Sequence, residues 1–192
     1  MNAIESLNPI NIELRKKNIL SIQEFLNIKL PNSIRKLLSD YNVAKPFYTY
    51  YSKEKIEFNL NYFFGHTEEK YKDFLHNYNT YLHRMPNELL PIASIDGGDL
   101  LCIDKNNGHI YYWFHEENDW GIEDNEVWPK KVADNLDEFL NSLTAAEKPT
   151  KEEIERAKKQ AKITKTTPIA LKFKNQARAK KGLPPLTMKD FE

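Results

Sequence analysis

The chain has 192 residues, and its 28 basic and 28 acidic side chains cancel to a formal net charge of zero. An apolar content of 40% excludes a wholly disordered chain, and the length fits one domain with or without an appendage. No apolar run approaches the roughly 18 residues of a membrane span. Residues 1–17 have no basic start followed by an apolar block, so we expect no secretory signal. With a single cysteine, an internal disulfide framework is excluded, so we expect a reduced, cytoplasmic protein.

Charge divides the chain near residues 145–149. Residues 1–144 contain 15 Lys or Arg against 22 Asp or Glu, whereas residues 145–192 contain 13 against 6. All aromatic residues except Phe173 and Phe191 lie before residue 145, so only the first part can bury a sizeable core. We therefore predict a globular domain over residues 1–144 and a basic C-terminal extension, helical or flexible, over residues 145–192.

Two helices are predicted before residue 42. Asn8-Pro9 is typical of a helix start, and residues 21–24 (SIQE) have the pattern of a capping box, so helical turns are expected within residues 9–28. Leu30-Pro31 starts the next helix. The side chains expected to face inward are Ile22, Phe25 and Leu26 in the first helix and Ile34, Leu37, Leu38 and Tyr41 in the second.

The rest of the domain alternates strands and helices. Strands are predicted over residues 46–51, 56–63, 89–94, 99–104 and 109–114, with helices over residues 67–82 and around 132–143. Gly97-Gly98 and residues 105–108 (KNNG) separate the last three strands by turns that tolerate positive φ, which favours an antiparallel meander. The predicted fold class is therefore α+β, a mostly antiparallel sheet with helices packed on it.

The order of these segments resembles the SUKH superfamily over roughly residues 20–144. The similarity is carried by the helix after Leu30-Pro31, by LLPIASIDGGDLLCID, by NNGHIYYWFHE and by the late helix VADNLDEFLNSL. The most specific part runs from Leu90 to Asp104. This superfamily includes fungal cell-wall-assembly regulators and many bacterial immunity proteins, so the resemblance implies a binding protein that neutralises a toxin, often a nuclease, by direct contact.

The residues themselves give little support to catalysis. The chain has no G-x-S-x-G, Walker or G-x-G-x-x-G motif, and its five histidines form no H-x-x-x-H pair. Asp96, Asp99 and Asp104 with His109 and His115 have the composition of a metal site, but their spacing fits no calcium loop. Cys102 lies in an apolar strand, as a buried thiol would. We predict neither an enzyme nor a cofactor or metal site.

The most informative surface feature is acidic. Residues 96–126 hold nine carboxylates against one lysine, Lys105, with Trp120 among them. A solvated loop explains many acidic segments, but a focused acidic face with an aromatic anchor suits a basic partner such as a nuclease domain. The predicted partner-binding residues are Asp96, Asp99, Glu116, Glu117, Asp119, Trp120, Glu123, Asp124 and Glu126.

The basic extension contains two predicted helices. Residues 150–153 (TKEE) form a capping box that opens the first, to about Lys162, and Thr167-Pro168 opens a second that Gly182 would end. Three alternatives stay open: a helical arm on the acidic domain, a basic arm that contacts nucleic acid, or a flexible extension. Nucleic acid is expected as a partner only through this extension, and no membrane partner is expected.

Two hypotheses of function follow. The first is an immunity protein that neutralises a cognate polymorphic toxin by stoichiometric occlusion, and it predicts that residues 1–144 retain most toxin binding. The alternative is a regulatory scaffold or adaptor of the same fold, whose basic tail recruits a protein partner or nucleic acid. This alternative predicts that removal of residues 145–192 abolishes function. An antidote gene should also lie directly downstream of a large toxin gene.

Overall fold

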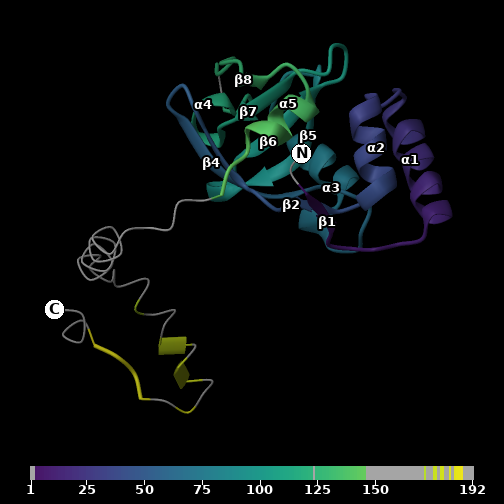
Figure 1. Ribbon diagram of the computed structural model, residues 1–192. Helices are drawn as coiled ribbons and strands as arrows, with labels where there is room; N and C mark the ends of the chain where they lie inside the picture. Colours follow the sequence, from purple (N-terminus) through teal and green to yellow (C-terminus); the bar gives the residue numbers. More distant parts are fainter. Residues whose placement is uncertain are drawn as a thin grey trace. The chain divides into compact units, whose positions relative to one another are not determined.

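The computed structural model describes residues 3–122, 124–145, 171, 175–176, 178–179, 182 and 184–187. The chain divides into two units, Met1–Ala146 and Glu147–Glu192. In the described part of the first unit, strands that are all paired antiparallel form the sheet (Figure 1). The strands are β1 (Ile4–Ser6), β2 (Ala44–Pro46), β3 (Tyr50–Lys53), β4 (Ile56–Phe63), β5 (Leu89–Ile95), β6 (Leu100–Asp104), β7 (Ile110–Trp113) and β8 (Lys130–Ala133).

The main path of the sheet runs β1-β2-β4-β5-β6-β7-β8, and β3 pairs with β4 beside it. The helices are α1 (Ile12–Leu26), α2 (Asn32–Tyr41), α3 (Phe74–Tyr81), α4 (His115–Asn118) and α5 (Leu136–Ser142), with short 3-10 turns at Lys70–Lys72 and Asp96–Gly98. Helices α1 and α2 lie side by side at one end of the domain (Figure 1). The predicted α+β class is thereby confirmed.

The predicted meander is present as β5, β6 and β7. Ile103 pairs with both Leu90 and Ile110, so β6 has a partner along each edge. Gly97, Gly98 and Gly108 have φ angles of 79°, 100° and 81°, the left-handed region that the turn prediction required. The buried strands β5 and β6 carry a nearly continuous apolar sequence because both of their faces are covered.

The start of the first helix differs from the prediction. Helix α1 begins at Ile12 with Asn11 as its cap, whose side chain accepts the Leu14 N–H at 2.8 Å, so the start at Asn8-Pro9 was wrong. Residues 21–24 lie inside α1, where the backbone amides already have helical partners, and therefore cap nothing. Phe25 is 59% exposed because the buried line of α1 runs through Ile19, Ile22 and Leu26.

Other predicted boundaries are also corrected. The strand over residues 46–51 is split between β2 and β3, and Phe47 between them is exposed. The helix over residues 67–82 is α-helical only from Phe74, because Asp73 caps it by accepting the His76 N–H at 2.8 Å. Val132 belongs to β8, and α5 starts after Asn135, which accepts the Glu138 N–H.

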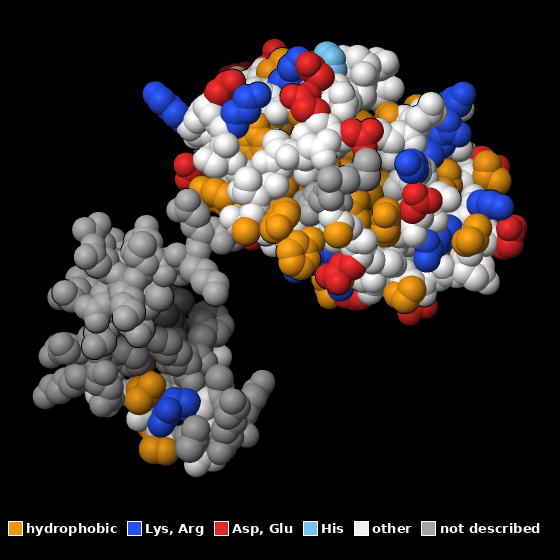
Figure 2. Space-filling view, viewed as in Figure 1, with side chains coloured by type: hydrophobic (Ala, Val, Ile, Leu, Met, Phe, Trp, Pro, Cys, Tyr) orange, Lys and Arg blue, Asp and Glu red, His pale blue; other side chains and the backbone are white. Residues whose placement is uncertain are grey.

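Aromatic rings from β3, β4 and β7 stack on one another in the domain. Tyr51 and Phe58 stack with ring centroids 4.9 Å apart, and Phe58 stacks on Tyr112 at 5.0 Å. Phe139 of α5 lies 5.7 Å from Tyr51, so the helix closes over the same rings. The aromatic-rich segment 47–64 therefore packs the core mainly through its β3 and β4 residues, while other hydrophobic side chains reach the surface among charged ones (Figure 2).

Cys102 is completely buried in β6, which confirms the structural interpretation of this thiol. Burial raises its pKa far above the ordinary range, so the reactive thiolate is disfavoured. In the tail, the described residues 171, 175–176 and 178–179 are helical, and Gly182 has a φ of 66°. These conformations agree with a helix that ends near Gly182, whereas the predicted helix from Thr150 to Lys162 lies outside the described residues.

Gly65 lies where two backbone segments meet directly. Its N–H donates to the Lys72 carbonyl at 3.0 Å, and its carbonyl accepts the Phe74 N–H at 2.7 Å. Asn42 fixes the neighbouring residue by exchanging two hydrogen bonds with the His66 backbone. A Cβ at position 65 would stand 2.5 Å from the Asn42 carbonyl carbon, which leaves no room for any side chain.

We therefore expect Gly65→Ala to lower the free energy of unfolding by about 1–3 kcal/mol, because backbone atoms must shift to admit the methyl group. Urea denaturation at pH 7 measures the change. Glu68→Ala, at an exposed position three residues on, serves as the control and should unfold at the wild-type urea concentration. An unchanged midpoint for Gly65→Ala would contradict the close approach.

Candidate protein-binding surface

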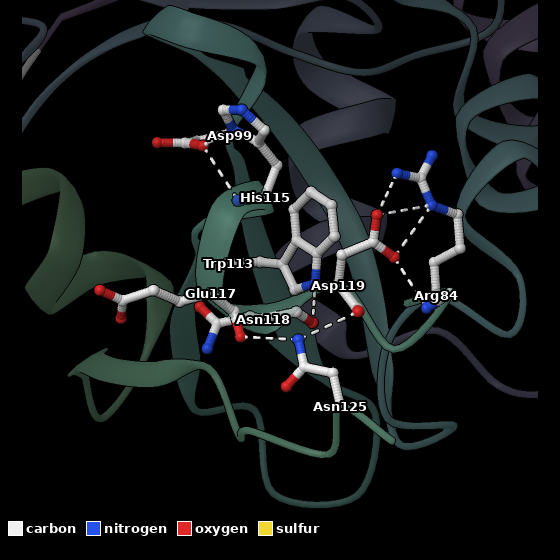
Figure 3. A network of polar contacts seen from close by, with 9 residues as sticks. Arg84, Asp99, Trp113, His115, Glu117, Asn118, Asp119 and Asn125 are labelled. Atoms are coloured by element: carbon white, nitrogen blue, oxygen red, sulfur yellow. Dashed lines mark hydrogen bonds and ion pairs between the residues drawn. The ribbon is translucent and has the colours of Figure 1, made fainter. Parts of the chain in front are cut away.

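The predicted acidic segment is a connection between β7 and β8, here called the acidic loop and comprising residues 115–128. It opens with the single turn of α4, and its described residues from 119 to 122 and from 124 to 128 contain no further helix or strand. Side chains of the loop itself and of residues outside it hold the loop backbone by the network drawn in Figure 3. Because these contacts set the loop's shape, they decide which of its side chains face outward.

The first anchor is Trp113, whose ring is completely buried at the end of β7. Its indole N–H needs a hydrogen-bond acceptor inside the protein, and the Asn118 carbonyl accepts it at 2.8 Å. The Asn118 side chain accepts the Phe114 N–H at 2.9 Å and donates to the Val127 and Trp128 carbonyls, each at 3.3 Å. Asn118 thus ties the start of the loop to its end.

Asn125 ties the middle of the loop together. Its side-chain amide donates to the Glu117 carbonyl at 2.9 Å and to the Asp119 carbonyl at 3.1 Å (Figure 3). Its side-chain oxygen accepts the Val127 N–H at 3.2 Å. The side chains of two asparagines, Asn118 and Asn125, therefore connect backbone groups along the loop after α4.

Asp119 is buried and forms an ion pair with Arg84, which precedes β5. The Arg84 Nε lies 3.1 Å from both carboxylate oxygens, and an Nη nitrogen makes a further contact with Oδ2. The Arg84 hydrogen bond is the main cause that lowers the pKa of Asp119, and the same bond raises the pKa of Arg84. The Trp120 N–H donates to the Arg84 carbonyl at 3.0 Å, so this pair also positions the next residue.

Asp99 is buried under the start of the loop. Its carboxylate accepts the Tyr112 hydroxyl at 2.5 Å and the His115 N–H at 3.2 Å, and it lies 2.6 Å from the His115 Nδ1. Burial, and then the hydrogen bond to Asp99, raise the pKa of the Tyr112 hydroxyl. Asp99 thus joins β7 to the start of the loop.

The predicted partner-binding residues therefore differ in what they can offer a partner. Asp99 and Asp119 are buried and engaged inside the domain, and Trp120 is half-buried. Glu123 lies outside the described residues. The members exposed to solvent are Asp96, Glu116, Glu117, Asp124 and Glu126.

Sequence reasoning named Trp120 as an aromatic anchor but missed two rings near it, Tyr111 and Trp128. Trp128 is 46% exposed at the end of the loop, and its ring centroid lies 5.9 Å from Trp120 and 6.3 Å from Tyr111. We call these three residues the aromatic ledge. Val127 and Ile122 are also more than half exposed nearby in the sequence. The sequence pattern that could have indicated these exposed side chains is the apolar pair Val127-Trp128 at the end of a charged run.

The acidic and histidine residues weighed as a metal site do not converge. Asp104 accepts the Asn106 N–H and the Asn107 amide, each at 2.8 Å, and so builds the turn before β7. Of the five described residues considered, only Asp99 and His115 are joined to each other by a hydrogen bond between their side chains. Within the described ranges, no three His, Cys, Asp or Glu side chains gather as ligands of a metal ion. No described helix has the length and apolar content to cross a membrane.

Comparison with known proteins assigns most of the sequence to a family. The model of the SMI1 / KNR4 family (SUKH-1) matches residues 13–142, which span the fold from α1 to the end of α5. The SPbeta prophage-derived uncharacterized protein YokK of Bacillus subtilis (strain 168) is 37% identical over 68 residues. That alignment covers 33% of this chain and 31% of the prophage protein, so the chain matches about a third of its relative's length.

We expect Asp119→Asn to lower the free energy of unfolding by about 1–2 kcal/mol at pH 7, because it removes a charged hydrogen-bond acceptor from a partly exposed arginine. Since Arg84 lowers the pKa of folded Asp119, the ion pair stabilises the protein above the unfolded-state pKa. This stabilisation is lost as the pH falls through the folded-state pKa.

Urea denaturation at pH 7 and in acid, below the ordinary pKa of aspartate, checks both parts. The difference between the two proteins should shrink in acid. Asp124→Asn is the matched control, because Asp124 is exposed and its φ of 61° suits asparagine equally well. Equal stability of Asp119→Asn and the wild type at pH 7 would contradict an anchoring role for the ion pair.

Proposed function

The chain belongs to the SMI1 / KNR4 family (SUKH-1), and from this membership we propose that it is an immunity protein acting in the cytoplasm. It binds a cognate polymorphic toxin and blocks it by direct, stoichiometric contact. The proposal needs no catalytic step from this chain. The observation that carries it is a fixed loop whose exposed side chains combine carboxylates with aromatic rings.

The acidic loop suits a basic partner because its negative charge is displayed on an ordered backbone. Glu116, Glu117 and Glu126 are exposed, whereas the loop's backbone is held by Asn118 and Asn125. A loop that is already ordered loses less conformational entropy when it binds. The electrostatic field of the loop's carboxylates would also raise the rate at which the protein encounters a positively charged surface.

A nuclease is the toxin class that this surface fits best. The groove of a nuclease is basic because it binds phosphate groups, so carboxylates that occupy it would exclude the nucleic acid. Trp120 and Trp128 add apolar contact area to the carboxylates of the loop. Tryptophan is frequent among the residues that dominate binding energy at protein interfaces. Occlusion of the groove then prevents cleavage without any chemical step.

The direct test is capture of the partner from the native strain with tagged full-length protein, followed by mass spectrometry. We expect one basic toxin domain at equal stoichiometry, and we expect co-expression of this chain to restore growth to cells that make that toxin. Recovery of housekeeping complexes or nucleic acid without a toxin would contradict the proposal. That outcome would favour a regulatory scaffold that recruits partners through the basic tail.

With the toxin in hand, the triple variant Glu116→Lys, Glu117→Lys, Glu126→Lys should associate about tenfold or more slowly at low salt, because electrostatic steering is reversed. Stopped-flow or surface-plasmon measurements at two salt concentrations give the rates. The matched control reverses three exposed glutamates elsewhere, Glu5, Glu13 and Glu24, and so has the same net charge. Equal slowing in both variants would assign the effect to net charge and contradict a role for the acidic loop.

A further inference from the structure

We propose that the aromatic ledge of Tyr111, Trp120 and Trp128 is a recognition site for an arginine side chain of the partner. The guanidinium group would stack on the exposed Trp128 ring and donate its N–H groups to carboxylates of the acidic loop. The identification of arginine rests on the proposed function only in assuming that the partner is a protein with a basic surface. The chemistry of the site is argued from the ledge itself.

Hydrogen bonds within the domain hold the residues of the ledge. Trp120 is held at its backbone by the Arg84 carbonyl at 3.0 Å and at its indole N–H by the Val127 carbonyl at 3.2 Å. The Trp128 carbonyl accepts a hydrogen bond from Asn118 at 3.3 Å. Tyr111 lies in β7, and its ring is tilted only 22° from the plane of Trp128. The half-exposed indole of Trp128 therefore packs against two rings whose own backbones are held in place.

Exposed rings of this size call for an explanation. Of the large hydrophobic side chains exposed on the described residues, Ile122, Val127 and Trp128 fall within seven consecutive positions of one loop. Ordered apolar patches with a polar rim are typical of binding sites. A wholly apolar partner would also have to desolvate Glu126, which directly precedes Val127 in the chain, and this costs free energy without a compensating charge.

The charges around the ledge favour a cation. Two lysines of β8 lie near it, but Lys130 is paired with Glu117 at 3.9 Å and Lys131 with Asp134 at 2.6 Å. Asp124 and Glu126 are exposed in the loop that carries the two tryptophans. The local excess is thus negative, and the aromatic faces add their own attraction for a positive group.

Arginine fits this arrangement better than lysine does. Its guanidinium is planar, weakly hydrated and able to stack on an indole while its edge donates to a carboxylate. The ammonium of lysine is strongly hydrated and has no face to stack. Arg84 gives an example of this geometry inside the domain, since its guanidinium carbon lies 5.2 Å from the Tyr81 ring and 5.9 Å from the Trp113 ring while it pairs with Asp119.

The experiment uses full-length 15N-labelled protein and needs no toxin. Its three tryptophans give three indole N–H signals, of which buried Trp113 is the internal reference. The probes are the acetylated, amidated peptides Gly-Arg-Gly-Arg-Gly and Gly-Lys-Gly-Lys-Gly, titrated at equal ionic strength. We expect the arginine peptide to shift the Trp128 and Trp120 signals, with a smaller effect from the lysine peptide and none on Trp113.

Trp128→Leu should raise the dissociation constant of the arginine peptide about two- to fivefold, as loss of one exposed cation–π contact predicts. Trp128→Tyr keeps a ring and should retain most of the binding, which separates stacking from a general effect on the fold. Phe47→Leu is the control, because Phe47 is a 75% exposed aromatic residue outside the loop. An unshifted Trp113 signal reports that each variant is folded.

Equal shifts from the two peptides, or an unchanged dissociation constant in Trp128→Leu, would overturn the arginine site. Neither result would affect the immunity proposal, which depends on capture of a toxin and on restored growth. Conversely, failure to capture a toxin would leave the preference between the two peptides intact. The two proposals can therefore fail separately.

Discussion

The acidic loop depends on one requirement, that the buried indole N–H of Trp113 must find a hydrogen-bond acceptor. The Asn118 carbonyl meets this requirement, and the side chain of the same residue then fixes both ends of the loop. An unpaired N–H in the core would cost more than the loop gains from any single surface contact. The shape of the outward surface therefore begins in the core of the domain.

Carboxylates in this region serve two separate purposes. Asp99 and Asp119 are buried and satisfy internal donors, and they hold the loop against β7 and against Arg84. Glu116, Glu117, Asp124 and Glu126 remain exposed and contribute charge to the surface. Counting acidic residues along the chain merges these groups, although only the second can meet a partner directly.

The fold class and the meander could be predicted because alternating apolar residues and glycine turns act locally. Strands β1 and β8 escaped prediction because each is short and is defined by backbone pairing with a distant strand. The position of the acidic loop was likewise evident from composition. The role of Asp119 was not, because its partner Arg84 lies 35 residues away in sequence and only the fold brings them together. The exposure of Trp128 could not be predicted either, because it depends on how the loop packs against Tyr111 of β7.

The loop separates the residues that hold its backbone from the residues that face solvent. Asn118 and Asn125 bind main-chain groups almost exclusively, so the backbone they shape is indifferent to the side chains at positions 116, 117, 126 and 128. A substitution at position 116, 117 or 126 would therefore leave these hydrogen bonds in place, whereas Trp128 also packs against Tyr111 and Trp120. The surface charge of such a loop can be altered while the hydrogen bonds that shape its backbone are kept.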